Sequence, residues 1–503
     1  MFKFSSEALR AHIKSDNAES LVIYNDLKNA YESSLKIYPK NINIMGVYFF
    51  NILKLLTISY FKYKEIKLGI QPKNLESHKK LNHWPYIGYQ DIKEGIDLRS
   101  KSFGAISPIN PRILQRMLQK VINSQYYLGR HFSHTISVIS PRIAYGENIL
   151  SIQSPKLKTN LITTGEGWFS VPALNDQLEL LGKAVAEVME KNDHPLSPLS
   201  IVEILLSHIK ADCKEGPIDF EFNSDILLLG SGVDLQNRML SMTALNKGMK
   251  IINIQHGEAF GIYDEPNFGD LGEGAYANAF LGFGDSALAY KDTYKHGLSK
   301  SIDYIKSNGT NVKKLYRPEF KGVNSKIEKI NFYYFPTTLS GSSHRYGPYR
   351  DTADYLYLSW QDLLIEFFNG KLNIKVHPKE KYSIDQNFNS INRVSGSIND
   401  LHEKIDVFVF DYIGTAFNEA CATDKPIIYF DLGIRNTASN VLESIKNRTI
   451  YFNLDDGMPL MSDIEELIHF DAIDNRYSLK YSLCGNNNSR SRSLSDGIAE
   501  IYG

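Results

Sequence analysis

Apolar residues are distributed differently in the first quarter of this chain of 503 residues and in the rest of it. Across roughly the first 130 residues they recur at helical spacing, as in SSEALRAHIK and NPRILQRMLQKVINSQYYLG. From residue 134 onwards, short apolar runs that end in glycine or in polar turns alternate with longer amphipathic segments. This pattern predicts a mainly helical region followed by an α/β protein with parallel sheets.

The alternation occurs in a first block that is followed by a polar stretch. Strands are predicted at 134–140, 159–168, 224–234, 249–257 and 278–284, and helices at 176–191 and 235–248. The polar stretch, residues 299–329, contains Gly and Pro and has no apolar core of its own. Such a composition is typical of a joint between two domains.

The alternation then restarts in a second block of similar size. Strands are predicted at 330–338, 372–378, 406–414, 425–431 and 449–453, and helices at 355–370, 415–424 and 437–447. We therefore predict two Rossmann-like domains that face a central cleft. The first spans 1–310, with a mainly helical part at 1–130, and the second spans 311–503.

Composition narrows the location and the partners of the protein. The formal net charge of −1 provides no overall positive field for nucleic acid, so no nucleic-acid partner is expected. The three cysteines, Cys213, Cys421 and Cys484, lack metal-binding spacing and are too few for a disulfide framework, which favours the cytoplasm. The N-terminal MFKFSSEALRAHIKSDN lacks the apolar core of a signal peptide.

One apolar segment, INIMGVYFFNILKLLTISYF at 42–61, has the length of a membrane-spanning helix. Asn43, Asn51 and Lys54 interrupt it, and a charge near the middle of a bilayer is costly. A buried helix is therefore the favoured interpretation. A helix that lies on the membrane surface is the alternative, and it would place the protein at the cytoplasmic face of the inner membrane.

Polar residues gather where two strands of the second block end. KVHPKE places Lys375, His377, Pro378 and Lys379 at the end of one strand. Parallel strands present their carboxyl ends at one edge of the sheet, where open α/β folds bind ligands.

The next strand of the second block continues into FVFDYIGTAFNEA. Gly414 provides a turn before a helix whose first residues include Thr415, and a helix start is a favourable place for phosphate. Glu419, one helical turn further on, could accept hydrogen bonds from ribose hydroxyls. The structural alternatives are a plain helix cap for Thr415 and a solvated helix face for Glu419.

KVHPKE followed by FVFDYIGTAFNEACATDKPIIYFD resembles the nucleotide-binding half of GT-B glycosyltransferases. More narrowly, it resembles bacterial enzymes that use CMP-activated acid sugars, such as sialic acid or 3-deoxy-manno-octulosonic acid (Kdo), to build capsule and O-antigen glycans. The resemblance implies that His377 and Pro378 bind CMP and that Thr415 binds its phosphate. It also implies that the loop 336–350, with Ser340, Ser342 and Ser343, closes over the nucleotide.

Three predicted strand ends of the first block complete the resemblance. They supply Glu166 in TTGEGW, Asp234 in GSGVDLQNR and His256 in IQHGEAFG. The order of these three residues resembles that found in the retaining β-Kdo transferases. The resemblance covers roughly residues 160 to 430. It implies transfer of Kdo from CMP-Kdo to a glycan or lipid-linked glycan acceptor in lipopolysaccharide or capsule synthesis.

These residue types suit a reaction that retains configuration through two inversions. Asp234 would attack the anomeric carbon, Glu166 would deprotonate the acceptor hydroxyl, and His256 would bind the leaving phosphate or the sugar carboxylate. Arg238 and Arg142 are further candidates for the carboxylate. A helix cap explains Asp234 equally well, an exposed turn is the alternative for Glu166, and solvated surface positions explain both arginines.

Other reaction classes fit the sequence less well. No Asp-x-Asp occurs, so neither a metal nor another cofactor is expected, and a metal-dependent GT-A enzyme is disfavoured. A dinucleotide-binding enzyme is disfavoured, because GSGVDL has Leu235 where the fingerprint needs its third glycine and GEGAYA (272–277) follows no clear strand. A P-loop kinase is excluded, because the sequence contains no GxxxxGK[ST] loop. The remaining alternatives are a CMP-sialic acid, CMP-pseudaminic acid or UDP-sugar donor, a UDP-sugar epimerase, and a non-catalytic glycan-binding scaffold.

Overall fold

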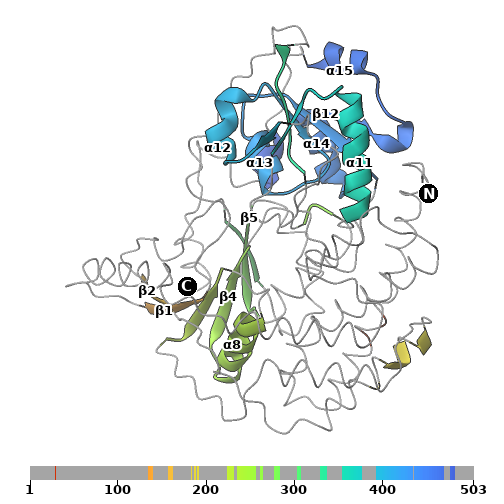
Figure 1. Ribbon diagram of the computed structural model, residues 1–503. Helices are drawn as coiled ribbons and strands as arrows, with labels where there is room; N and C mark the ends of the chain where they lie inside the picture. Colours follow the sequence, from red (N-terminus) through yellow and green to blue (C-terminus); the bar gives the residue numbers. More distant parts are fainter. Residues whose placement is uncertain are drawn as a thin grey trace, which may run out of the picture.

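The computed structural model of the chain describes well-placed segments that are separated by gaps. They are residues 134–139, 157–161, 224–230, 235–255, 261–263, 277–283, 303–307, 329–336, 354–375, 392–433, 436–468 and 476–481, with the single positions or pairs 26, 29, 183, 186–188 and 190–191. The strands among them form two six-stranded sheets, and every pairing is parallel (Figure 1). The predicted α/β class is confirmed by these sheets.

The first sheet is built from the strands of the first block. They are β1 (His134–Ile139), β2 (Leu157–Leu161), β3 (Ile226–Leu229), β4 (Lys250–Ile254), β5 (Ala279–Phe283) and β6 (Asp303–Ser307). The spatial order is β2-β1-β3-β4-β5-β6, so the order reverses between β1 and β3. The first five of these strands overlap the predicted ones.

Burial on both faces explains the continuous apolar runs in the middle of this sheet. All four residues of β3 are buried, and β4 is buried beyond its first residue. The helix α8 (Leu235–Asn246) packs against β3 and β4, and its Leu240 and Ala244 are fully buried. The helix ends where the sequence predicts, since Gly248 has a φ of 77°, a left-handed conformation that glycine adopts readily.

The predicted joint at 299–329 is partly wrong, because it contains the sixth strand of the first sheet. β6 pairs with β5 along its whole length, from Ala279 opposite Asp303 to Phe283 opposite Ser307. The strand is short, carries charges and lies at the edge of the sheet. Edge strands commonly have this composition, so they cannot be recognised from apolar runs in the sequence.

The second sheet contains β7 (Phe332–Tyr334), β8 (Leu372–Lys375), β9 (Arg393–Val394), β10 (Val407–Phe410), β11 (Ile427–Asp431) and β12 (Ile450–Asn453). Its order is β12-β11-β10-β7-β8-β9. Counted in chain order, this is the 3-2-1-4-5-6 arrangement of dinucleotide-binding folds. The order reverses between β7 and β10, which are direct neighbours.

Helices cover both faces of the second sheet, so alternate strand residues enter two separate cores. On one face Tyr334, Val409 and Phe430 pack with α11 (Asp354–Phe367) and α15 (Met461–Leu467). On the other face Phe335, Phe408 and Tyr429 pack with α12 (Ile398–Leu401), α13 (Thr415–Cys421), α14 (Ser439–Arg448) and α16 (Arg476–Tyr481). Figure 1 shows α11, α12, α13, α14 and α15 around β12 in the C-terminal part.

Several predictions concern residues outside the described segments. Of the region 1–130 only Asp26 and Asn29 are described, both in helix, and the apolar segment 42–61 is not described. In the part of the chain that is described, no helix is long and apolar enough to cross a membrane. The predicted helix at 176–191 is helical at each of its described positions.

Candidate functional site

The reversal of strand order in the second sheet marks its candidate binding edge. In open α/β sheets, ligands bind outside the carboxyl ends of the two strands between which the order reverses. Here these strands are β7, which runs on into Phe335 and Pro336, and β10, which runs on into Asp411. The two chain segments singled out in the sequence, 336–350 and FVFDYIGTAFNEA, therefore begin at this point.

Asp411 is a carboxyl group buried at this edge. Its side chain is 5% exposed, and Oδ2 accepts a hydrogen bond of 2.5 Å from the Tyr334 hydroxyl at the end of β7. Burial raises the pKa of Asp411 to about 7, and the Tyr334 hydroxyl partly opposes this rise. The Trp360 indole also lowers the pKa, although neither its N–H nor Asp411 Oδ1 meets the geometry of a hydrogen bond. The hydrogen bond from Tyr334 thus ties the ends of β7 and β10 together.

The turn from β10 into α13 is close-fitting. Gly414 occupies the N-cap position with extended backbone (φ −153°), and a Cβ there would lie 3.1 Å from the Tyr412 ring. The close contact with the Tyr412 ring, and not a left-handed turn, is therefore what disfavours a larger residue at this position. Thr415 is the first residue inside the helix, and no side chain caps α13. The helix-cap alternative for Thr415 is wrong.

Two predicted nucleotide-binding residues lie close enough across the edge to interact electrostatically. Burial raises the pKa of Glu419 to about 7, and the nearby positive charge of Lys375 lowers it in part. Lys375 is the last residue of β8, whereas Glu419 lies in α13, which follows β10. The two residues thus approach from opposite sides of β7. Glu419 is half-buried, which argues against the solvated-face alternative for this residue.

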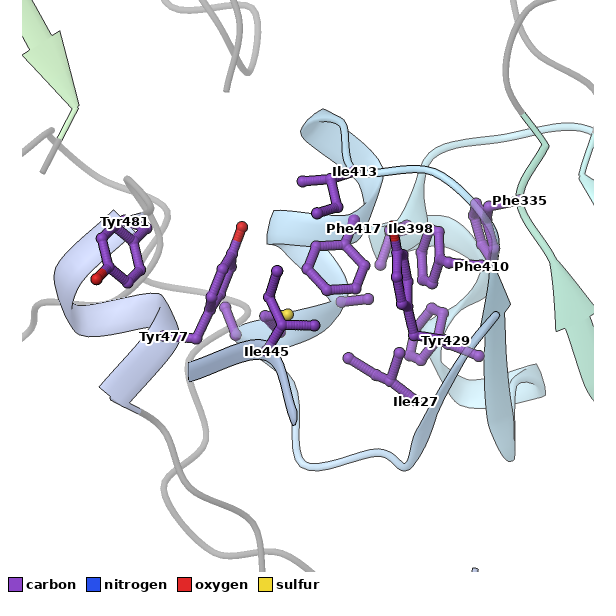
Figure 2. Packing of buried hydrophobic residues seen from close by; sticks show 14 of the residues in the cluster. Phe335, Ile398, Phe410, Ile413, Phe417, Ile427, Tyr429, Ile445, Tyr477 and Tyr481 are labelled. Carbon is purple, nitrogen blue, oxygen red and sulfur yellow. The ribbon is translucent and has the colours of Figure 1, made fainter. Parts of the chain in front are cut away.

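The aromatic core beneath α13 fixes where this helix lies. Phe417 is fully buried, and its ring makes edge contacts with Phe410, Tyr429 and Tyr477 at centroid distances of 5.4, 5.4 and 5.5 Å (Figure 2). Next to it, the Tyr477 hydroxyl donates a 2.8 Å hydrogen bond to Asn418 Oδ1. These contacts come from β10, β11 and α16, so α13 is held by three elements.

The opposite end of α13 is held by a buried arginine. Arg448 is 2% exposed, and its guanidinium donates hydrogen bonds to main-chain carbonyl oxygens around the start of the α13–β11 connection. The acceptors and distances are Cys421 at 3.0 Å, Ala420 at 3.2 Å, Thr423 at 3.0 Å and Lys425 at 3.3 Å. The role of Arg448 was not predictable from the sequence, because acceptors in the main chain leave no sequence pattern.

The predicted catalytic residues, and Arg142 as a candidate for the sugar carboxylate, follow neighbouring strands of the first sheet. Glu166, Arg142, Asp234 and His256 come after β2, β1, β3 and β4, which are consecutive in the order of the sheet. All four strands are parallel, so their carboxyl ends lie at one edge. The four residues themselves lie outside the described segments. Asp234 immediately precedes α8, which leaves open both the nucleophile and the helix cap.

Other predicted site residues also lie outside the described part of the chain. These are His377, Pro378, Lys379, Ser340, Ser342 and Ser343, and for Arg238 in α8 only the backbone is described. Their roles remain predictions. Of the predicted nucleotide-binding residues, Lys375, Gly414, Thr415 and Glu419 are placed, all at the carboxyl edge of the second sheet.

A contact that the sequence did not predict joins the carboxyl edges of the two sheets. Ile262 follows β4 by a few residues, yet its side chain is fully buried in the core that contains Phe417. Its carbonyl oxygen accepts a hydrogen bond of 2.9 Å from the N–H of Ala438, and Tyr263 forms an antiparallel bridge with Thr437. Residues 437 and 438 lie between β11 and α14, at the carboxyl edge of the second sheet.

Comparison with known proteins adds little to this picture. No family model matches the chain, and no curated protein matches it. The chain is similar to the solved glycotransferase of kitacinnamycin, with 10% identity, 69% of this chain and 92% of that chain covered, and a TM-score of 0.30. It is also similar to the glycosyltransferase SnogD from Streptomyces nogalater, with 9% identity, coverage of 74% and 99%, and a TM-score of 0.30. At this TM-score we draw no conclusion from either similarity.

Proposed function

We propose that the protein is a GT-B type glycosyltransferase that transfers Kdo from CMP-Kdo to a glycan acceptor with retention of configuration. The observation that carries this proposal is the contact between the carboxyl edges of two parallel sheets. One edge belongs to the sheet with the strand order of nucleotide-binding folds, and Lys375, Thr415 and Glu419 lie at this edge. The other edge follows the strands that lead to Glu166, Asp234 and His256.

In this proposal the second sheet binds the nucleotide. Glu419 accepts hydrogen bonds from the ribose hydroxyls, and Thr415 with the backbone of the α13 start binds the phosphate. Lys375 supplies positive charge beside both groups. His377, Pro378, Lys379, Ser340 and Ser342 contact the nucleotide as the family resemblance implies. No metal takes part, since Lys375, the α13 start and His256 would meet the charge of the phosphate.

The first sheet would carry out the chemistry in two displacements. The Asp234 carboxylate attacks the anomeric carbon and forms a C–O bond, while the bond from this carbon to the phosphate oxygen breaks and CMP leaves. Glu166 then takes the proton of the acceptor hydroxyl, whose oxygen attacks the same carbon and releases Asp234. Two inversions give net retention. His256, Arg238 and Arg142 would bind the phosphate or the sugar carboxylate.

The experiment that tests this proposal is a donor assay with the purified full-length protein. CMP-Kdo is incubated with the protein and a panel of glycan acceptors, and release of CMP and the mass of the product are followed. We expect CMP release that depends on acceptor, and a product that is heavier by one Kdo residue. Transfer only from CMP-sialic acid, CMP-pseudaminic acid or a UDP-sugar would overturn the donor assignment. Glycan binding without transfer from any donor would indicate a non-catalytic scaffold.

A further inference from the structure

The segment 261–263 ties the two sheet edges together over a short length of chain. Gln255, directly after β4, is fully buried and donates its backbone N–H to the Leu281 carbonyl at 2.9 Å, so it belongs to the first sheet. Ile262 is fully buried in a core of the second sheet. Six residue steps from Gln255 to Gly261 span at most about 20 Å. The two edges are therefore held within this distance of each other.

Each of the three residues contributes to the attachment. Gly261 is buried and has a φ of 68°, a left-handed conformation that suits glycine. The side chain of Ile262 lies in the core of the second sheet that contains Phe417. Its carbonyl oxygen accepts a hydrogen bond from the N–H of Ala438, the N-cap residue of α14. No side chain caps α14, so the carbonyl of Ile262 satisfies one of the N–H groups that a helix start leaves unpaired. Tyr263 adds the bridge to Thr437.

We propose that residues 261–263 form a strap that stays attached to the second sheet and limits the distance between the two sheet edges, and that Ile262 is a positioning residue for transfer between them. This inference rests on the proposed function, because transfer needs both edges at one substrate. The strap begins five residues after His256, a predicted catalytic residue. A shift of about 1 Å in such a position can lower a rate by two orders of magnitude. Most of the proposed contacts to CMP come from the second edge, so CMP affinity depends less on this spacing than the rate does.

The first test compares two isoleucines of the same core. Ile262→Ala is set beside Ile427→Ala, since Ile427 is equally buried but lies at the start of β11, at the opposite edge of the sheet. Both variants lose core packing, so both should unfold at lower temperature. We expect kcat to fall about tenfold or more only in Ile262→Ala, with CMP affinity changed by less than kcat because most of the proposed CMP contacts lie at the second edge. Equal kcat in the two variants would overturn the positioning role.

A second test does not require activity. Hydrogen exchange of the Ala438 amide should be faster in Ile262→Ala than in the wild type, and unchanged in Ile427→Ala. If the wild type transfers no sugar from any donor, the proposed function is wrong. This measurement still tests whether residues 261–263 are attached to the second sheet. Unchanged exchange at Ala438 in Ile262→Ala would show that the strap is not a stable attachment.

A third test asks whether the strap is fixed during turnover. Paired residues on antiparallel segments have Cα atoms about 4.5–5.5 Å apart, which permits a disulfide. Oxidised Tyr263→Cys/Thr437→Cys should keep the transfer activity of its reduced form, with the two single variants as controls. Loss of transfer on oxidation that reduction restores would mean that the strap must release, which contradicts the proposal. This variant keeps the test available if Ile262→Ala does not fold.

Discussion

In the first sheet the strand order reverses between β1 and β3, and in the second it reverses between β7 and β10. Beyond β3 the chain continues with Gly230, Ser231 and Gly232, whereas beyond β10 it continues with the buried Asp411 and Ile413. The residues that follow β10 therefore pack on an aromatic core, whereas the chain that follows β3 begins with glycine. This difference fits the proposed division of labour, in which the second edge binds the nucleotide and the first edge carries out the chemistry.

The largest expected effect is on the transfer rate, and it concerns Asp234, the proposed nucleophile at the first edge. Asp234→Ala should lower transfer by about a thousandfold or more, because the nucleophile is lost, and it should leave CMP affinity unchanged. Asp225→Ala is the matched control, since Asp225 is exposed and lies just before β3, at its other end. Steady-state kinetics and calorimetry measure the two effects. A loss of about 1 kcal/mol in stability with full activity would show instead that Asp234 caps α8.

The support of the second edge can be tested through Arg448. Replacing it with Met should lower the free energy of unfolding by about 3 kcal/mol, since main-chain carbonyls of the α13–β11 connection would lose their buried donor. Urea denaturation measures this change. Arg393→Met, at an exposed position of β9, should cost less than about 1 kcal/mol. Equal losses in the two variants would mean that the buried hydrogen bonds contribute nothing net.

Sequence and structure agree best where a strand is buried on both faces. The apolar runs VFVF and IIYF were sufficient to predict β10 and β11, since such runs are typical of central parallel strands. The edge strands β6 and β9 and the helices α12, α15 and α16 were missed because they are short and partly polar.

The candidate site was predictable only where it depends on local sequence. Lys375 and Glu419 were identified from motifs, and the structure places them near each other. The pairing of Asp411 with Tyr334 and the insertion of Ile262 join residues that are far apart in the chain. No local pattern encodes such contacts, because they depend on strand order and on how the two edges meet.

The raised pKa of Glu419 predicts a pH dependence of nucleotide binding at the second edge. The ionised carboxylate is the stronger acceptor for ribose hydroxyls, so CMP affinity should rise about tenfold between pH 6 and pH 8 as Glu419 ionises near pH 7. Glu419→Gln should lose this rise. Glu443→Gln, at an exposed position of α14, should keep it and reports the contribution of the CMP phosphate itself. Identical pH profiles in both variants would remove Glu419 from the site.

Asp411 predicts a smaller effect on stability. Its pKa is raised in the folded state, so its contribution to stability is complete below its unfolded pKa of 3.8 and is lost as the pH rises through about 7. Between pH 6 and pH 8 this loss amounts to about 1.4 kcal/mol. Asp411→Asn should remove this part of the pH dependence, as measured by urea denaturation at both pH values. A variant that keeps the full dependence would show that Asp411 titrates as it does in the unfolded chain.

The claim that the nucleotide lies at the carboxyl edge of the second sheet is tested most directly by calorimetric titration of CMP into two lysine variants. Lys371 immediately precedes β8 and is exposed, whereas Lys375 is the last residue of this strand. We predict that Lys375→Met weakens CMP binding about tenfold and that Lys371→Met leaves it unchanged within about twofold. Equal affinities in the two variants, or a larger loss in Lys371→Met, would contradict the account.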